Sequence, residues 1–238
     1  MAIADALKLL HDNIMQSAAK AGRNPDLIKL IAVSKTVDIQ SIKEAIRAGA
    51  TILGENRVQE AKEKINDLRV QSPPLGKGGT KGGVEWHLIG SLQRNKAKTA
   101  VQLFNLIHSV NSVSLADDLN RHAGNVGKTQ RILVQVKLAE EQTKHGVDEA
   151  DIMALLDKIM ELDNIALQGL MTIPPFFDDP EESRPYFKRL RDIADTAIKK
   201  GYPVKELSMG MSNDYQVAIE EGATMIRVGT FIFGERNY

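Results

Sequence analysis

The sequence predicts an α/β fold, a single (β/α)8 TIM barrel with an extra N-terminal helix. Eight short apolar runs rich in β-branched residues alternate with amphipathic helical stretches. Most of these runs are continuously hydrophobic, as is usual for parallel strands that are covered on both faces. A length of 238 residues suits one such barrel, so we expect one domain over residues 1–238.

The expected elements follow one another along the chain. An amphipathic helix comes first, with Ile3, Ala6, Leu7, Leu10 and Ile14 at helical spacing. The expected strands are 30–34, 51–53, 86–90, 106–110, 132–136, 167–173, 206–209 and 225–228, and helical candidates between them include 39–48, 58–68, 152–161 and 185–199. Periodicity alone does not separate a closed barrel from an open doubly wound sheet, which is the alternative fold.

Two segments share the pattern of a helix end followed by a strand. Residues 45–51 (AIRAGAT) are echoed by residues 218–224 (AIEEGAT). In both, a glycine stands where a left-handed residue commonly ends a helix. The echo favours repeated helix–strand units and says nothing about function.

Composition excludes several classes of protein. Lys+Arg and Asp+Glu both number 31, so no basic excess indicates a nucleic acid or an anionic membrane as partner. Cysteine is absent, which removes disulfides, thiolate nucleophiles and Cys-ligated zinc. No secretory signal and no apolar run of about 18 residues is found.

No long apolar stripe calls for a partner, so we expect a cytoplasmic monomer. No metal is expected, because the histidines lack a second ligand at metal spacing; they are His11, His87, His108, His122 and His145.

A low-complexity stretch at about 71–85 is rich in proline and glycine, and it includes the run 76–83. We expect a flexible surface loop there, because such a stretch cannot pack a core. A helix precedes it and a strand follows, the reverse of the order in a phosphate-binding loop. A nucleotide site is therefore not expected in this stretch.

Lys35 is the first residue to suggest chemistry. It directly follows an apolar strand, so its amine is expected at the barrel mouth, where such barrels carry their functional groups. A lysine there can attack an aldehyde if its surroundings favour the neutral amine. The alternative is a lysine that extends from the strand end into solvent.

An anion site is predicted at the other end of the chain. Residues 208–214 (SMGMSND) place capping residues after a strand, and Asn213 with Gln216 resembles a capping box. Arg227 lies in the last strand and is followed by Gly229 and Thr230. In such barrels phosphate groups favour the loops after strands seven and eight. The alternative is ordinary capping and an ion-paired Arg227.

Together these features describe a phosphorylated aldehyde held at two points. Pyridoxal 5′-phosphate (PLP) is the commonest ligand of that kind, with a Schiff base on Lys35. Arg227 could then face the pyridine nitrogen. A guanidinium cannot give up a proton, so that nitrogen would stay unprotonated and the ring would be a weak electron sink.

Five motifs are spread over nearly the whole chain: 32–36 (AVSKT), 54–60 (GENRVQE), 86–96 (WHLIGSLQRNK), 208–212 (SMGMS) and 227–234 (RVGTFIFG). With these motifs, in this order, the sequence resembles the pyridoxal phosphate homeostasis proteins. The resemblance implies a barrel similar to the N-terminal domain of alanine racemase. The cofactor-binding residues that it implies are Lys35 for the Schiff base, Arg227 for the pyridine nitrogen, Met211, Ser212, Gly229 and Thr230 for the phosphate, and Asn56 near the ring. The run 76–83 departs from the family pattern as an insertion.

The resemblance also implies a carrier or buffer of PLP without established turnover, one that could supply PLP-dependent apo-enzymes. A PLP-dependent racemase is the first alternative, but it needs a second acid/base, for which Tyr215 and Tyr238 are the candidates. We expect no second domain to supply that group. A Schiff-base aldolase is the second alternative, in which Glu55 would assist Lys35.

Overall fold

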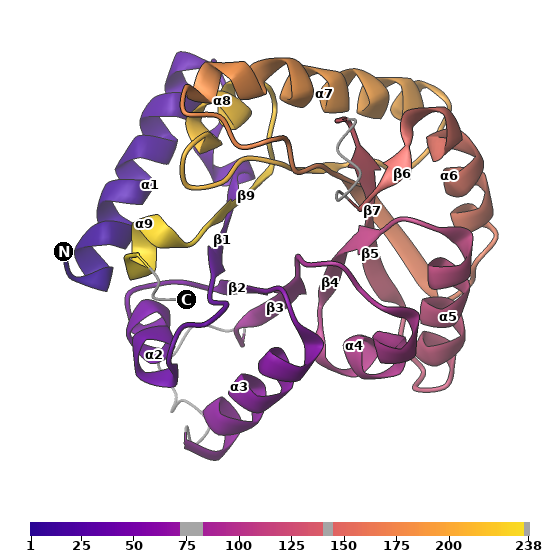
Figure 1. The fold of residues 1–238 in the computed structure, drawn as a ribbon, viewed down its shortest axis with the longest axis horizontal. Coiled ribbons are helices and arrows are strands. Elements are labelled where there is room, and N and C mark those ends of the chain that lie inside the picture. The colour runs from indigo at the N-terminus through magenta and orange to yellow at the C-terminus, as the bar shows by residue number, and fades with distance from the viewer. Residues whose placement is uncertain (72–82, 140–144, 236–238) are drawn as a thin grey trace.

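Eight parallel strands close into a barrel in the computed structural model, which describes residues 1–71, 83–139 and 145–235 (Figure 1). Neighbours pair in the order β1-β2-β3-β4-β5-β7-β8-β9, and the ring closes because β9 also pairs with β1. The strands are β1 (Lys29–Val33), β2 (Ile52–Glu55), β3 (Glu85–Leu88), β4 (Leu106–Val110), β5 (Gln130–Lys137), β7 (Ile165–Met171), β8 (Glu206–Ser208) and β9 (Met225–Val228). The predicted barrel is confirmed, and the open sheet is excluded.

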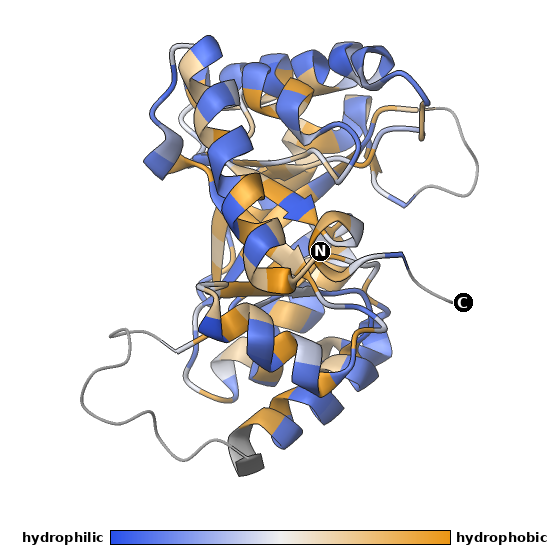
Figure 2. Ribbon diagram, turned by 90° about the vertical axis from the view of Figure 1, so that its left-hand side faces the viewer, coloured by the Kyte–Doolittle hydropathy of each residue, from blue (hydrophilic) through white to orange (hydrophobic). Residues whose placement is uncertain are grey.

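Helices surround the ring of strands. They are α2 (Ile39–Arg47), α3 (Val58–Gln71), α4 (Ala97–Leu103), α5 (Val113–Gly124), α6 (Ile152–Met160), α7 (Arg184–Lys199), α8 (Tyr215–Glu220) and α9 (Thr230–Phe233). The strands carry apolar residues, and the outer faces of the helices are polar (Figure 2). The two-residue strand β6 (Val147–Asp148) pairs with the end of β5 outside the ring. Among the helices described, none is both long and apolar enough to traverse a bilayer.

The predicted N-terminal helix is present as α1 (Ile3–Lys20), and it fills the outer position that α9 is too short to occupy. Its apolar face packs against α8, α2 and α9 (Figure 1). Just after the helix, Arg23 Nη1 donates hydrogen bonds to the carbonyls of Ile219 and Ala223 at 2.7 and 2.8 Å. The helix is therefore part of the outer ring and not an appendage.

The two echoed segments form the same structure. α2 and α8 are each followed by a glycine with positive φ, 102° at Gly49 and 106° at Gly222, before β2 and β9 begin. These left-handed residues turn the chain from the helix back into the barrel. The predicted repeated unit is confirmed.

The predicted flexible loop at about 71–85 falls mostly on residues 72–82, outside the described residues. Its neighbours α3 and β3 place both attachment points at the amino-terminal mouth of the barrel. Both points are thus far from the carboxyl ends of the strands.

Leu10 and Leu9 allow a test of the role of α1. The Leu10 side chain is fully buried and Leu9 is 45% exposed on the same helix. We expect Leu10→Ala to lower the free energy of unfolding by about 2–5 kcal/mol, through lost burial and a cavity. Leu9→Ala should change it by less than about 0.5 kcal/mol. Urea unfolding measures both, and equal losses would show that α1 does not pack as described.

Candidate functional site

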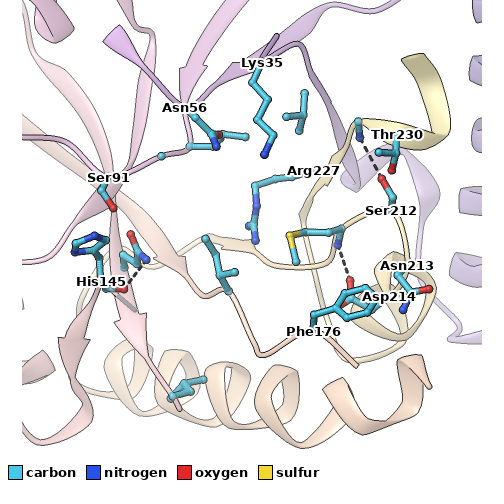
Figure 3. Close-up of a pocket in the computed structure, with 18 of the residues that line it drawn as sticks. Lys35, Asn56, Ser91, His145, Phe176, Ser212, Asn213, Asp214, Arg227 and Thr230 are labelled. Atoms are coloured by element: carbon cyan, nitrogen blue, oxygen red, sulfur yellow. Dashed lines mark hydrogen bonds between the residues drawn. The ribbon is translucent and has the colours of Figure 1, made fainter. Parts of the chain in front are cut away.

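A cavity of about 600 Å³ opens at the carboxyl ends of the strands. The structure brings all the residues predicted to bind the cofactor into its lining: Lys35, Asn56, Met211, Ser212, Arg227, Gly229 and Thr230. They come from loops after β1, β2 and β8 and from β9 and the residues that follow it (Figure 3). Segments up to 195 residues apart in sequence thus meet at one mouth.

Lys35 projects into this cavity toward Arg227 (Figure 3). It is half-buried, and no hydrogen bond or ion pair engages its amine within the described part of the chain. The next residue, Thr36, has φ 59°, and no other non-glycine residue described has a positive φ. Such a conformation is costly for a β-branched residue, so the surrounding contacts must impose it.

Lys64 supplies those contacts from α3. Its ammonium donates to the Ser34 carbonyl at 2.5 Å, to Glu55 at 2.9 Å and to Glu60 at 2.6 Å. Glu60 in turn accepts from the Thr36 amide at 2.5 Å. The backbone on both sides of Lys35 is therefore tied to one helix, which fixes where the Lys35 side chain begins.

Glu55 belongs to this support and not to the cavity. It is fully buried, accepts a hydrogen bond from Ser34 Oγ at 2.7 Å and does not line the cavity. Burial raises the pKa of its carboxyl, and the neighbouring Lys64 partly offsets that effect. The aldolase alternative, in which Glu55 assists Lys35, has no geometric support.

Arg227 is buried on β9 with neutral partners. Its guanidinium donates to Ser208 Oγ at 2.6 Å and to the Thr172 carbonyl at 2.9 Å. No carboxylate lies within ion-pair distance among the residues that the structure describes. Burial lowers the pKa of Arg227 to about 10, so it is still cationic at neutral pH. The ion-paired alternative is wrong, and this buried charge favours a ligand that accepts hydrogen bonds.

The predicted phosphate cradle lies between β8 and α9. The Met211 amide is already bound to Asp214 Oδ1 at 2.6 Å, and the Gly229 amide donates to Ser212 Oγ at 3.3 Å. The amides of Ser212 and Thr230 have no acceptor among the described residues. These two N–H groups and their hydroxyls are the groups of the cradle that can bind an anion.

The capping box predicted for Asn213 and Gln216 is wrong. The helix α8 begins at Tyr215 with Asp214 as its N-cap residue, and no side chain caps it. Asn213 Nδ2 instead donates to the Phe177 carbonyl at 2.9 Å. The tight turn at Gly210, φ 90°, uses the Asp214 carboxylate to hold the Met211 amide, which starts the helix one residue later.

Asn56 enters the cavity because β2 and β3 approach closely at their ends. A Cβ atom on Gly90 would lie 2.4 Å from the Asn56 carbonyl oxygen, so a larger residue at position 90 would displace this backbone. The far side of the cavity is lined by residues outside the predicted cofactor-binding set: Ser91, Gln135, Lys137, His145, Phe176 and Phe177. Most of them follow β3, β5 and β7, so their position after a strand was the available signal.

The charges around the cavity favour an anionic ligand. Among the described residues, Lys35, Lys137 and Arg227 line it, against one carboxylate, that of Asp214, which is bound to the Met211 amide. In the described parts of the chain, no group of three or more His, Asp or Glu side chains could hold a metal ion. The donors present therefore match a small anion that also offers an electrophilic carbon to Lys35.

A closed parallel barrel with a lysine after its first strand and this cradle after its last two defines an alanine racemase-type barrel. The family model "Alanine racemase, N-terminal domain" matches residues 6–237. The chain is 40% identical to the pyridoxal phosphate homeostasis protein of Aquifex aeolicus, covering 98% of both chains, and 37% identical to that of Escherichia coli K12, covering 99% of this chain and 97% of the relative. This chain belongs to the pyridoxal phosphate homeostasis protein family.

Solved structures agree with this assignment. PipY of Synechococcus elongatus PCC7942, solved with PLP bound, has a TM-score of 0.82 and 38% identity, over 98% of this chain and all of that one. An alanine racemase of Clostridium difficile 630 is 17% identical with a TM-score of 0.63, over 95% of this chain and 57% of that one. The second likeness establishes the fold alone.

Replacing Lys64 tests the support beneath Lys35. Lys64→Met should lower stability by roughly 3–5 kcal/mol at neutral pH, because it leaves the buried Glu55 carboxylate without its cation. The pKa of Glu55 is already raised, so its protonation relieves that cost, and the loss should shrink as pH falls from about 8 to about 5.

Denaturant unfolding across this pH range measures the effect. The matched control is Lys62→Met, an exposed position on the same helix, which should be close to neutral. A loss that is independent of pH would contradict the role given to Glu55.

Proposed function

We propose that this chain binds PLP in the cavity at the carboxyl mouth and carries or buffers that cofactor. One observation carries the proposal. The amine of Lys35, which has no hydrogen bond or ion pair among the described residues, faces the buried Arg227 across a cavity that also presents the amides of Ser212 and Thr230. PLP has an aldehyde, a ring nitrogen and a phosphate on different sides of one small ring. Its three functional groups match these three sets of donors.

Each residue then has a distinct task. Lys35 would bond to the aldehyde carbon, and Arg227 would donate a hydrogen bond to the ring nitrogen. Met211, Ser212, Gly229 and Thr230 would hold the phosphate, with Asn56 beside the ring; the amides of Ser212 and Thr230 and the nearby hydroxyls would be its donors. Bound PLP supplies an electrophilic aldehyde and an electron-withdrawing ring. Since Arg227 donates without releasing its proton, the ring nitrogen keeps its lone pair.

The carrier role is supported by how few acid/base groups line the described part of the cavity besides Lys35. Within the described lining of the cavity there is no tyrosine, and the carboxylate of Asp214 is occupied. Tyr215, a candidate base, is buried on α8, and its hydroxyl accepts a hydrogen bond from Asn13 in α1. Tyr238 lies outside the described residues. These features agree with a carrier that consists of a single domain over residues 1–238 and supplies PLP to apo-enzymes.

The covalent attachment is tested on purified protein loaded with PLP. We expect a yellow protein whose visible absorbance is removed by borohydride, after which mass spectrometry locates the cofactor on Lys35. Lys35→Ala should lose the visible band and remain folded, because its amine makes no hydrogen bond or ion pair with any described residue. Lys137→Ala, which removes another lysine of the same cavity, should keep the band. A band that survives Lys35→Ala would overturn the assignment.

Carrier and racemase are separated by turnover. The protein with bound PLP is incubated with L-alanine in deuterated water, and exchange of the α-proton is followed by NMR. We expect no more than about one exchange per protein, because the described lining offers neither a tyrosine nor a free carboxylate as the second acid/base. Many turnovers that disappear in His145→Ala would identify His145 as that group and would show an enzyme.

A further inference from the structure

A chain of hydrogen bonds crosses the barrel interior from Arg227 to the opposite mouth. Arg227 Nη1 lies 2.6 Å from Ser208 Oγ, and Ser208 Oγ lies 2.9 Å from His108 Nδ1. His108 Nε2 is 3.1 Å from His87 Nδ1, and His87 Nε2 is 3.2 Å from Glu85 Oε2. The four groups that connect Arg227 to the opposite end come from β8, β4 and β3.

These connecting side chains are shielded from water except at the far end. Ser208 and His108 are completely buried and His87 is 1% exposed, whereas the Glu85 side chain is 41% exposed. Burial lowers the pKa of both histidines, so both rings are neutral near pH 7. The chain of hydrogen bonds therefore runs through the buried interior and reaches solvent at Glu85.

Both ends of the chain fix its direction. Arg227 can only donate, and an ionised Glu85 can only accept. Hydrogen bonds from His87 and Arg131 lower the pKa of Glu85 to about 2, which keeps it ionised. His87 must therefore carry its proton on Nε2 and accept at Nδ1, and His108 must do the same. Ser208 then donates its hydroxyl proton to His108 and accepts from Arg227.

The reverse arrangement fails at the carboxylate. If His108 donated through Nδ1 to Ser208, its Nε2 would need a proton from His87 Nδ1. His87 Nε2 would then present a lone pair to the Glu85 carboxylate. Two acceptors, His87 Nε2 and Glu85 Oε2, would then face each other at 3.2 Å. The Ser208 hydroxyl proton would also lose its acceptor, His108 Nδ1.

We propose that Glu85, His87, His108 and Ser208 form a positioning relay that holds the Arg227 guanidinium from the side facing the amino-terminal mouth. The charge of Glu85 at that mouth then affects how tightly the cofactor is bound at the carboxyl mouth. The inference rests on the proposed binding of PLP. The carboxylate of Glu85 orients the two rings, the rings orient the Ser208 hydroxyl, and Ser208 fixes one arm of the guanidinium. In such a chain of hydrogen bonds, each bond also polarises the next one and so strengthens it.

The opposite mouth supplies a matched control. A second cavity of about 420 Å³ is lined there by both Glu85 and Glu206. Glu206 pairs with Lys29 and accepts from Thr224 Oγ1 at 2.6 Å, and it has no hydrogen bond or ion pair with His87. Glu206→Gln therefore removes the same charge from the same cavity without touching the relay.

The tautomers are tested first in the protein without PLP, by nitrogen-15 NMR of the histidine rings. We expect two rings that carry a proton on Nε2 alone and do not titrate between about pH 6 and pH 8. Glu85→Gln should alter the signals of both buried rings, and Glu206→Gln should leave them unchanged. A proton on Nδ1 of His108, or a charged His108 ring, would overturn the relay.

The effect on the cofactor site is then measured as the rate at which bound PLP is released to an apo-enzyme acceptor. Glu85→Gln should release PLP about three- to tenfold faster, equivalent to the loss of one hydrogen bond, while Glu206→Gln matches the parent. Adding Glu85→Gln to Ser208→Ala should cause no further acceleration, since the link to Arg227 is already cut. Equal rates for Glu85→Gln and Glu206→Gln, or additive effects in the double variant, would overturn the inference.

The two proposals fail in different ways. If the parent protein does not retain PLP, the proposed function is wrong, while the tautomers can still be read from the protein without cofactor. If the parent retains PLP and Glu85→Gln alters neither the ring signals nor the release rate, only the relay is wrong. Thermal unfolding of each variant identifies any loss that reflects misfolding.

Discussion

Closure of the parallel sheet is the constraint on which the rest of this molecule depends. Since all eight strands run the same way and β9 pairs with β1, every carboxyl end faces one mouth. Lys35 follows β1 and Arg227 lies in β9, the two strands that pair to close the barrel, although 192 positions separate these residues in sequence. A single geometric condition thus brings an amine, a guanidinium and an anion cradle to one cavity, and it leaves the opposite mouth for other contacts.

Much of this arrangement could be predicted from the sequence because its signals are local. Strands covered on both faces must be continuously apolar, so all eight were recognisable, with boundaries that differ by a few residues. Lys35 was identifiable because a charged residue directly follows such a strand. Gly49 and Gly222 were identifiable because a left-handed residue after a helix favours glycine. The sequence therefore indicated which residues gather at the mouth, and their roles there are still proposals.

Features that depend on register between distant strands could not be predicted. His87 and His108 looked scattered, yet they meet because β3 and β4 place both side chains inside the barrel. Asn213 resembled a cap, but the turn at Gly210 gives the N-cap position to Asp214. The support of Lys35 by Lys64 depends on how α3 lies across the ends of β1 and β2. In each case tertiary packing decided between local patterns that were individually reasonable.

The position of α1 has a consequence for how the chain folds during translation. This helix and β1 are synthesised well before α8 and β9, against which they pack; Asn13 and Tyr215 are 202 positions apart. Synthesis takes seconds, so the apolar faces of both early elements stay uncovered for that time. Joining such distant segments also carries a large loop-closure entropy. The nascent chain therefore exposes the apolar faces of α1 and β1 until α8 and β9 have left the ribosome, and aggregation is a hazard during that interval.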